Sequence, residues 1–452
     1  MYDEVKKERL FTNQQLLALL WPLIIEQALG VLVGMADTVM VSSVGEAAIS
    51  GVSLVDMINQ LIITVFGALA TGGAVVTSQH LGAKRPEEAA RSAGQLVGLS
   101  GILGTTVAAF CLVTRTAQLR LFFGTISEDV MQACLTYFTI TALSFPFLAL
   151  YNAGAAIFRS TGNSAVSMKV SVLVNAINFC GNALCVFVLR MGVAGVAVPT
   201  LVSRAVGAVI ILSLAARRDY VLRITPRTVT RLEGRTVKGI LYIGIPSAFE
   251  NSLFQLGRVL VVSMISLFGT VHISANAVAN NLDAVGCIVG NAMGLAMITV
   301  VGRCVGAQDF EQTKHYTKKL LLWDYIAQGT VNLLVLFFLN RILGMYTLSP
   351  ETRALSWTLV MIHNGVAILL WPAGFVLPNA LRAANDVRFT MLTSILSMIV
   401  WRMGLSWVLC VNMGMGAVGV WLAMVVDWIC RVTCFVIRFA SGAWQKSAVK
   451  KV

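Results

Sequence analysis

QLLALLWPLIIEQALGVLVGMADTVM, at residues 15–40, is an apolar run long enough to cross a lipid bilayer as one helix, yet it carries Glu26 and Asp37. Its apolar residues do not alternate with polar ones, so the run predicts a helix and excludes a barrel strand. The two carboxylates are three helical turns apart, about 16 Å along one face. Each costs about 3 kcal/mol inside a membrane, which predicts a functional role for both. Pro22, one turn before Glu26, predicts that this helix can bend and act as a gate.

Similar apolar runs of about 20 to 26 residues recur along the whole chain. Hydrophobic residues make up 57% of the 452 positions and charged residues 12%, about half the charged share of a soluble domain. We therefore predict an all-α membrane protein with twelve transmembrane helices. The predicted spans lie near residues 15–40, 52–77, 92–114, 131–156, 165–188, 192–215, 239–264, 276–302, 318–341, 356–381, 388–411 and 415–438.

Lysine and arginine are distributed unevenly between the spans. Most of the 34 basic residues lie in the N-terminal segment, the C-terminal segment and the loops that follow even-numbered spans. This bias predicts that both termini are cytoplasmic. The net charge of +13 thus reflects membrane topology and does not indicate nucleic-acid binding, because the basic residues form short clusters. The charged N-terminal stretch runs into the first span without a small-residue cleavage site, which predicts an uncleaved anchor in the cell membrane.

The two halves of the sequence repeat each other. Identical residues recur at a constant spacing, as in Pro22 and Pro246, Glu26 and Glu250, and Gly82 and Gly306. In the stretch around Arg159 and Arg382 the spacing is shorter by one position. Because each half has an even number of spans, both enter the membrane in the same direction and are related by a pseudo-two-fold axis along the membrane normal. We predict an N-lobe at residues 1–216, a basic cytoplasmic linker at 217–238 and a C-lobe at 239–452.

Amide side chains form a stripe on the predicted helix at residues 165–188. Asn175, Asn178 and Asn182 follow at i, i+3 and i+7, on one helical face. Together with Asp37 and Thr200 they predict either an oxygen cage for sodium or a hydrogen-bonded proton site. The alternative is that the amides and Thr200 are interhelical hydrogen bonds without a bound ion.

Other ionisable residues inside the spans have simpler explanations. Glu250 repeats Glu26 and could pair with Arg258, two turns further along the same helix. Asp427 and Arg431 are four residues apart, which predicts a local ion pair.

A further group of ionisable residues is assigned no functional role. Asp56 and Asp283 lie near predicted span ends, where helix capping or contact with water explains them. His363 is expected to be a core histidine.

Catalysis and metal binding are not predicted. The nine cysteines form no CxxC pair, and the four histidines form no HExxH or similar motif. An intramembrane enzyme would require such a metal pair or a nucleophile beside a base. We therefore expect neither an enzyme nor a cofactor.

Five segments in order resemble the multidrug and toxic compound extrusion (MATE) family of cation-coupled exporters. They are MADTVMVSSVGEAAISGVSL (35–54), HLGAKRPEEAAR (80–91), VNAINFCGNALCVFVLRMGVAGVAVPT (174–200), IPSAFENSLFQLGR (245–258) and ALRAANDVRFTM (380–391). The resemblance implies that Asp37 is the carboxylate that exchanges the coupling ion, sodium or a proton. It also implies that Asn178, Asn182 and Thr200 complete that site, with Asp37, Asn178 and Thr200 as sodium ligands.

This chain departs from the family pattern in two places. The family usually has aspartate at the position of Asn182, so the site here has one negative charge fewer. An aspartate that accompanies the Glu250 position in one subgroup is replaced by Trp371. We therefore do not expect a C-lobe sodium site of that kind, although Glu26, Glu250 and Asn175 stay candidates for binding protons or cationic substrates.

The resulting hypothesis is a monomeric antiporter in the lipid bilayer of the cell membrane. It would export small organic cations through a cavity between the lobes, in exchange for sodium ions or protons. The alternative is a flippase for an anionic lipid-linked sugar carrier. A flippase would require several basic residues facing its cavity.

Overall fold

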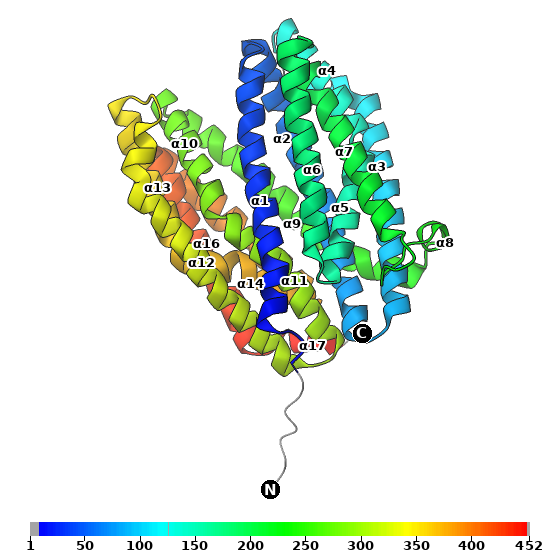
Figure 1. Cartoon of the computed structure of the whole chain (residues 1–452). Helices are drawn as coiled ribbons and strands as arrows, with labels where there is room; N and C mark the ends of the chain where they lie inside the picture. The colour runs from blue at the N-terminus through cyan, green and yellow to red at the C-terminus, as the bar shows by residue number, and fades with distance from the viewer. Residues whose placement is uncertain (1–8, 125, 450–452) are drawn as a thin grey trace.

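The computed structural model describes residues 9–124 and 126–449, and the regular secondary structure of this part is helical throughout (Figure 1). The elements are α1 (Asn13–Ser42), α2 (Glu46–Gly82), α3 (Pro86–Phe123), α4 (Glu128–Leu143), α5 (Phe145–Ser160), α6 (Ser164–Ala183), η1 (Leu184–Val188), α7 (Ala194–Ala215), α8 (Pro226–Thr230), α9 (Gly234–Ser266), α10 (Thr270–Gly286), α11 (Ile288–Gly306), α12 (Phe310–Gly344), α13 (Pro350–Trp371), η2 (Pro372–Val376), α14 (Leu377–Ala383), α15 (Val387–Ser397), η3 (Met398–Leu405), η4 (Val408–Asn412), α16 (Gly416–Ala440) and α17 (Gln445–Val449), where η marks a π-helical segment.

The predicted twelve-span architecture is confirmed. Within the described residues, ten helices are long and apolar enough to cross a membrane, and the pair α4 and α5, bent by 45°, makes an eleventh span. The twelfth is α9, whose apolar character is interrupted by Glu250 and Arg258. Helix α9 begins at Gly234 and so extends into the basic segment predicted as a linker. The exact lobe boundaries stay a prediction.

The loops between the helices show the duplication at the level of the backbone. Gly45 and Gly269 stand before α2 and α10 with positive φ angles of 138° and 87°, which a glycine adopts without steric cost. Lys84 and Gln308, another pair at the repeat spacing, have φ angles of 58° and 54°. The same turn conformations therefore recur at corresponding places in the two halves.

Toward the end of the two halves, the spacing between repeat mates returns to its longer value. The π-helical segments explain this change. The pair Met168 and Met391 has the shorter spacing, whereas Gly192 and Gly416 have the longer one. Segment η4 corresponds to η1 at the longer spacing, but η3 has no π-helical counterpart among the described residues of the N-lobe. A π-bulge accommodates one extra residue in a helix. The extra residue of the C-lobe therefore lies in η3, which carries Arg402.

The two lobes meet through small residues at one end of the bundle. A Cβ atom on Gly82 would lie 2.0 Å from the carbonyl oxygen of Arg303, and a Cβ on Gly306 would lie 1.9 Å from that of Gln79. Gly82 and Gly306 are repeat mates, as are Gln79 and Arg303, so the contact is reciprocal. In Figure 1 this is the end of the molecule with the start of α1 and with α17, and the lobes lie further apart at the end with α4 and α10.

Reciprocal hydrogen bonds accompany these contacts. The Gln79 amide donates to the Ala383 carbonyl at 2.8 Å, and the Arg303 guanidinium donates to the Ser160 carbonyl at 2.8 and 3.2 Å. Ser160 and Ala383 are repeat mates at the shorter spacing. Each lobe therefore holds the other by a side chain near the end of α2 or α11, and the interface has the pseudo-two-fold symmetry that the repeat predicts.

The predicted ion pair of α16 is present and fully buried. The Arg431 Nε atom donates to Asp427 Oδ1 at 3.0 Å, and Ser397 also donates to this carboxylate. Asp427 has no exposed surface, and the Arg431 guanidinium lies over the rings of Phe254 and Phe375. Both charges are thus compensated inside the C-lobe.

Removing one partner of this pair is expected to destabilise the protein. Asp427→Ala leaves the buried Arg431 charge uncompensated, which costs about 3–5 kcal/mol. Thermal unfolding in detergent micelles measures the loss. Asp219→Ala, which removes an exposed loop carboxylate, is the control. Combining Asp427→Ala with Arg431→Met should recover much of the stability. Equal unfolding temperatures for Asp427→Ala and the control would contradict the argument.

Candidate functional site

The N-lobe contains a cavity of about 310 Å³ between α1, α2, α4, α6 and α7. Its wall is rich in polar side chains. They include Asp37, Asp56, Asn175, Asn178, Thr200 and Arg204. A membrane protein tolerates such a polar cavity because water or a polar ligand can satisfy these groups.

The residues predicted to form the cation-coupling site are brought together in one hydrogen-bonded chain. The Asn182 amide donates to Asp37 Oδ1 at 2.8 Å and to Asn178 Oδ1 at 3.3 Å. The Asn178 amide in turn donates to Thr200 Oγ1 at 3.0 Å. Asp37 comes from α1, the two asparagines from α6 and Thr200 from α7, so three helices meet here. Their role in ion coupling stays a prediction.

Oxygen atoms of these hydrogen-bonded side chains are available for a cation. Asn182 is fully buried, and its Oδ1 atom has no hydrogen-bond partner among the described residues. A buried amide oxygen without a partner is costly, and a bound cation would satisfy it. Asn175 lines the same cavity and donates to Ser171 at 3.4 Å, outside the chain. The donor set of carboxylate, amide and hydroxyl oxygens suits sodium, and Asp37 alone could carry a proton.

Four further residues, Asp56, Asn59, Tyr137 and Arg204, line the N-lobe cavity. Asp56 on α2 accepts hydrogen bonds at 3.1 Å from both Asn59 and Tyr137, and Arg204 on α7 donates to Ser144 at 2.7 Å. Capping does not explain Asp56, because its helix begins ten positions earlier, at Glu46, whereas the alternative of contact with water stays a prediction. Its carboxylate therefore faces the cavity inside the lobe.

Glu26 and Glu250 lie outside the walls of the two lobe cavities. Glu26 pairs with Arg159 at 3.3 Å and accepts from Ser167 at 2.9 Å, and Glu250 pairs with Arg382 at 2.7 Å. The two ion pairs are related by the repeat. Glu250 does not pair with Arg258, because a residue two turns away on one helix is farther than Arg382 on α14. A proton or substrate role for Glu26 and Glu250 stays a prediction.

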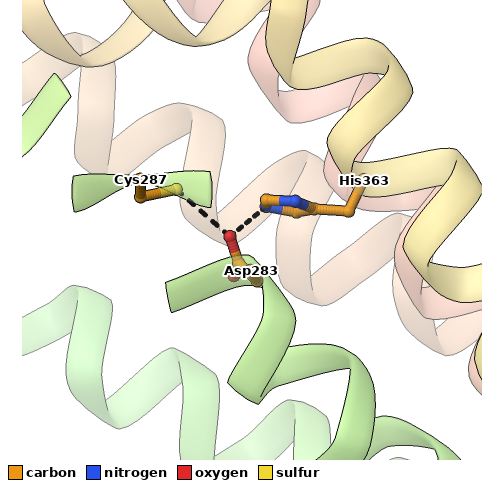
Figure 2. A group of neighbouring side chains, drawn as sticks. All are labelled: Asp283, Cys287 and His363. Atoms are coloured by element: carbon orange, nitrogen blue, oxygen red, sulfur yellow. Dashed lines mark hydrogen bonds and ion pairs between the residues drawn. The ribbon is translucent and has the colours of Figure 1, made fainter. Parts of the chain in front are cut away.

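The C-lobe contains a second cavity, of about 370 Å³. Figure 2 shows the polar cluster in its wall, where Asp283 on α10 accepts from His363 Nε2 at 2.7 Å and from Cys287 Sγ at 3.2 Å. Asp283 lies three residues before the end of α10 at Gly286, and its explanation by capping or contact with water stays a prediction. His363 is a buried histidine, as expected, but its partner is a carboxylate that faces a cavity. Trp371 forms another part of this wall.

A sequence signal for Asp56 and Asp283 exists but is visible only when the halves are aligned. The N-lobe has Asp56 and Asn59 where the C-lobe has Asn280 and Asp283. The carboxylate and the amide have exchanged places on the same helical face, three residues apart. All four side chains line a cavity of their own lobe. Each lobe has a carboxylate at one of the same two equivalent positions, which indicates a functional site and not a helix cap.

Helix α1 contributes to both cavities. Asp37 lines the N-lobe cavity, and Val31, less than two turns earlier, lines the C-lobe cavity. Figure 1 shows α1 between the helices of the two lobes. Pro22 lies inside this helix, where it removes one backbone hydrogen bond. A change in the shape of α1 would therefore alter both cavities at once.

Comparisons with known proteins agree with this architecture. The family model described as MatE matches residues 22–184 and again residues 246–408, at the same spacing as the sequence repeat. The uncharacterized transporter YisQ of Bacillus subtilis is 27% identical over 439 residues, which cover 95% of this chain and 94% of that protein. The probable multidrug resistance protein NorM of Thermotoga maritima is 25% identical and covers 97% of this chain and 94% of its own length.

Solved structures show the same fold. An outward-facing multidrug resistance MATE family transporter of the MOP superfamily superimposes with a TM-score of 0.88 at 20% identity, covering 97% of this chain and 96% of that one. A MOP superfamily transporter from Pyrococcus furiosus, for which a reversed polarity of the binding pocket is described as suggesting a different function, has a TM-score of 0.88 at 21% identity and covers 97% of both chains.

Proposed function

Since the chain belongs to the MatE family of multidrug efflux transporters, we propose that it is a secondary antiporter that exports cationic and amphiphilic organic compounds in exchange for sodium ions or protons. The observation that carries this proposal is the N-lobe cavity. Two acidic residues, Asp37 and Asp56, and a single basic residue, Arg204, line this cavity, so its net negative charge attracts a cation. One chain contains both lobes, which supports a functional monomer.

Coupling follows from competition for the same carboxylate. A coupling ion at Asp37 neutralises the charge that an organic cation would otherwise bind. Binding drives transport only when each ligand favours a different conformation. With the cytoplasmic termini that we predict, the closed end of the lobes would face the cytoplasm, and the structure would correspond to an outward-facing state. Ion binding would favour this state, and substrate binding would favour the return.

Helix α1 is the element that links ion binding to the conformational change. Asp37 lies on α1, and its hydrogen bond to Asn182 attaches α1 to α6. Protonation or sodium binding changes the charge on this carboxylate and hence the strength of that hydrogen bond. Because Pro22 already interrupts the backbone hydrogen bonds of α1, the helix can bend at this position. The charge at Asp37 would thus be converted into a movement of α1 against both lobes.

Asn182→Asp is expected to strengthen sodium binding about tenfold. The variant places a second carboxylate beside Asp37, and ligand charge raises cation affinity at an oxygen site. Sodium-dependent thermal stabilisation of the purified protein measures this affinity, because a bound ligand raises the stability of the folded state. Asn13→Asp adds the same charge at the exposed start of α1 and is the control. Equal sodium responses of the variant and the control would contradict the oxygen cage.

Efflux of ethidium from cells that express the wild-type chain tests the proposed function. Efflux is measured with sodium present, with sodium replaced, and with the proton gradient collapsed. We expect efflux that stops under one of the ion conditions, and that condition identifies the coupling ion. Expressed and folded protein that moves no organic cation under any condition would overturn the proposal and favour the lipid flippase.

A flippase for an anionic lipid carrier is the second candidate, and one observation favours it. Arg258 and Arg402 both line the C-lobe cavity, where an anionic group could bind. The pair of aspartates in the N-lobe cavity argues against a flippase, because a large polyanion would contact both cavities and these carboxylates would repel it. Transport of a fluorescent anionic lipid between the leaflets of proteoliposomes separates the two functions.

A further inference from the structure

The two cavities have opposite charge. The N-lobe cavity is lined by two aspartates and one arginine, whereas the C-lobe cavity is lined by Arg258, Arg402, Asp283 and His363. With neutral histidine, the lining of the N-lobe cavity has a net charge of minus one and that of the C-lobe cavity plus one. A cavity with low-dielectric walls concentrates the field of such charges and selects ligands by sign.

The carboxylate of the C-lobe cavity is already engaged. Asp283 accepts hydrogen bonds from His363 and Cys287, as Figure 2 shows, and the nearby Asp427 pairs with Arg431. Among the described residues, no carboxylate therefore lies within ion-pair distance of the two cavity arginines, although Asp283 and Asp427 interact with them electrostatically. Within the described residues, Arg258 and Arg402 form no ion pair or hydrogen bond, and the Arg402 Nε atom is buried without a partner. An unused donor of a buried guanidinium, as in Arg402, requires an acceptor inside a membrane lobe, whereas the side chain of Arg258 is exposed.

Arg402 stands where the N-lobe has a cation-site residue. At the longer repeat spacing its mate is Asn178, which belongs to the Asp37 hydrogen-bond chain. The corresponding mates of Asp37 and Thr200 are Val261 and Met424, and both line the C-lobe cavity. The C-lobe has therefore lost the carboxylate and hydroxyl of the cation site and gained a guanidinium. Arg402 also lies in η3, which has no π-helical counterpart among the described residues of the N-lobe.

Aromatic side chains form a large part of the cavity wall. Trp371, Trp421 and Trp428 line it together with Phe254 and Phe375. Planar rings can stack on these walls, while the arginine fork binds a carboxylate through two parallel hydrogen bonds. From this arrangement we propose that the C-lobe cavity binds the carboxylate of an aromatic amphiphile through Arg258 and Arg402, so that carboxylated and zwitterionic aromatic compounds are preferred substrates of this antiporter.

A metal ion is a poorer occupant of the same wall. Asp283, Cys287 and His363 each offer one ligand atom, and these atoms lie within 4.8 Å of one another. However, the three groups already satisfy one another by hydrogen bonds, and two unpaired arginines line the same cavity. A cation there would be repelled by both guanidinium groups, whereas an anion would be attracted. The cluster instead fixes Asp283 and keeps the arginines available.

The proposal rests on the proposed antiport function, and a matched pair of dyes separates the two. A rhodamine with a free carboxylate and its methyl ester share one aromatic cation and differ only in the anionic group. Binding of each dye to the purified protein is measured by fluorescence polarisation, and efflux of each from cells is measured in parallel. We expect the acid to bind at least tenfold more tightly than the ester, since a charge-assisted hydrogen bond contributes about that factor or more.

Variants assign the preference to the cavity. Arg402→Asn, which introduces the residue of the N-lobe mate, and Arg258→Gln should each reduce acid binding about tenfold and leave ester binding within about threefold. Arg402→Lys keeps the charge and should retain part of the preference, which controls for misfolding. Arg120→Gln removes an exposed arginine on α3 and should change neither dye.

The outcomes are distinct. Efflux of the ester without a preference for the acid supports the antiporter and overturns the carboxylate site. A preference for the acid that survives both Arg402→Asn and Arg258→Gln also overturns it. Binding of the acid without efflux of either dye refutes the antiport function while the site itself stands.

Discussion

Asp37→Asn is expected to reduce cation-driven efflux of ethidium at least about thirtyfold while the protein stays folded. The variant removes the negative charge that both the coupling ion and the substrate would bind, and truncating one partner of a buried charged contact costs about 2–5 kcal/mol. The neutral amide can still occupy the space beside Asn182. The initial rate of efflux from cells, normalised to the amount of protein in the membrane, measures the effect.

Two variants make this result specific. Asp219→Asn removes an exposed loop carboxylate and should transport as the wild type does. Asp37→Glu keeps the charge and shifts it by one methylene, so it should retain part of the efflux and its dependence on the ion gradient. If Asp37→Asn keeps both the efflux rate and the ion dependence of the wild type, the N-lobe cavity is not the coupling site.

Gly306→Ala is expected to reduce efflux about tenfold or more by preventing the lobes from closing at the end where α2 and α11 meet. The new Cβ would lie 1.9 Å from the Gln79 carbonyl oxygen, and a backbone atom in a packed helix cannot move out of its way cheaply. The lobes must separate there, so the conformational equilibrium shifts away from the state seen in this structure. Because Gly82 occupies the equivalent place, Gly82→Ala should give the same result.

Labelling of a cysteine at position 78 reports the separation directly. Ser78 is fully buried and faces Gly302 of the other lobe, so in Ser78→Cys, introduced after the nine native cysteines are replaced by serine, the thiol should be protected from a water-soluble maleimide. Adding Gly306→Ala should expose it. Gly67→Ala lies on the same helix as Gly82, with no atom within 4 Å of its new Cβ, and should leave both labelling and efflux unchanged. Protection of the thiol in the Gly306→Ala background would contradict this role of the interface.

The hydrogen-bonded group around Asp37 was more predictable than the C-lobe cavity for a physical reason. Asn178 and Asn182 are one helical turn apart, so the periodicity alone places their side chains on one face. Asp37 and Thr200 could be added because polar groups in a span require partners. Asp283 and His363 lie on different helices, α10 and α13, and nothing in either helix alone indicates that these two helices pack together. Arg382 as the partner of Glu250 was unpredictable for the same reason.

The sequence by itself determined the membrane environment, the number of spans, the duplication and the helical face of each polar residue. These follow from the length and periodicity of apolar runs, which depend only on the bilayer and on helix geometry. The tertiary structure alone decided which faces meet, and hence that the lobes carry cavities of opposite charge. Contacts between helices depend on the packing of the whole bundle, in which small residues such as Gly82 and Gly306 allow a close approach that no single span encodes.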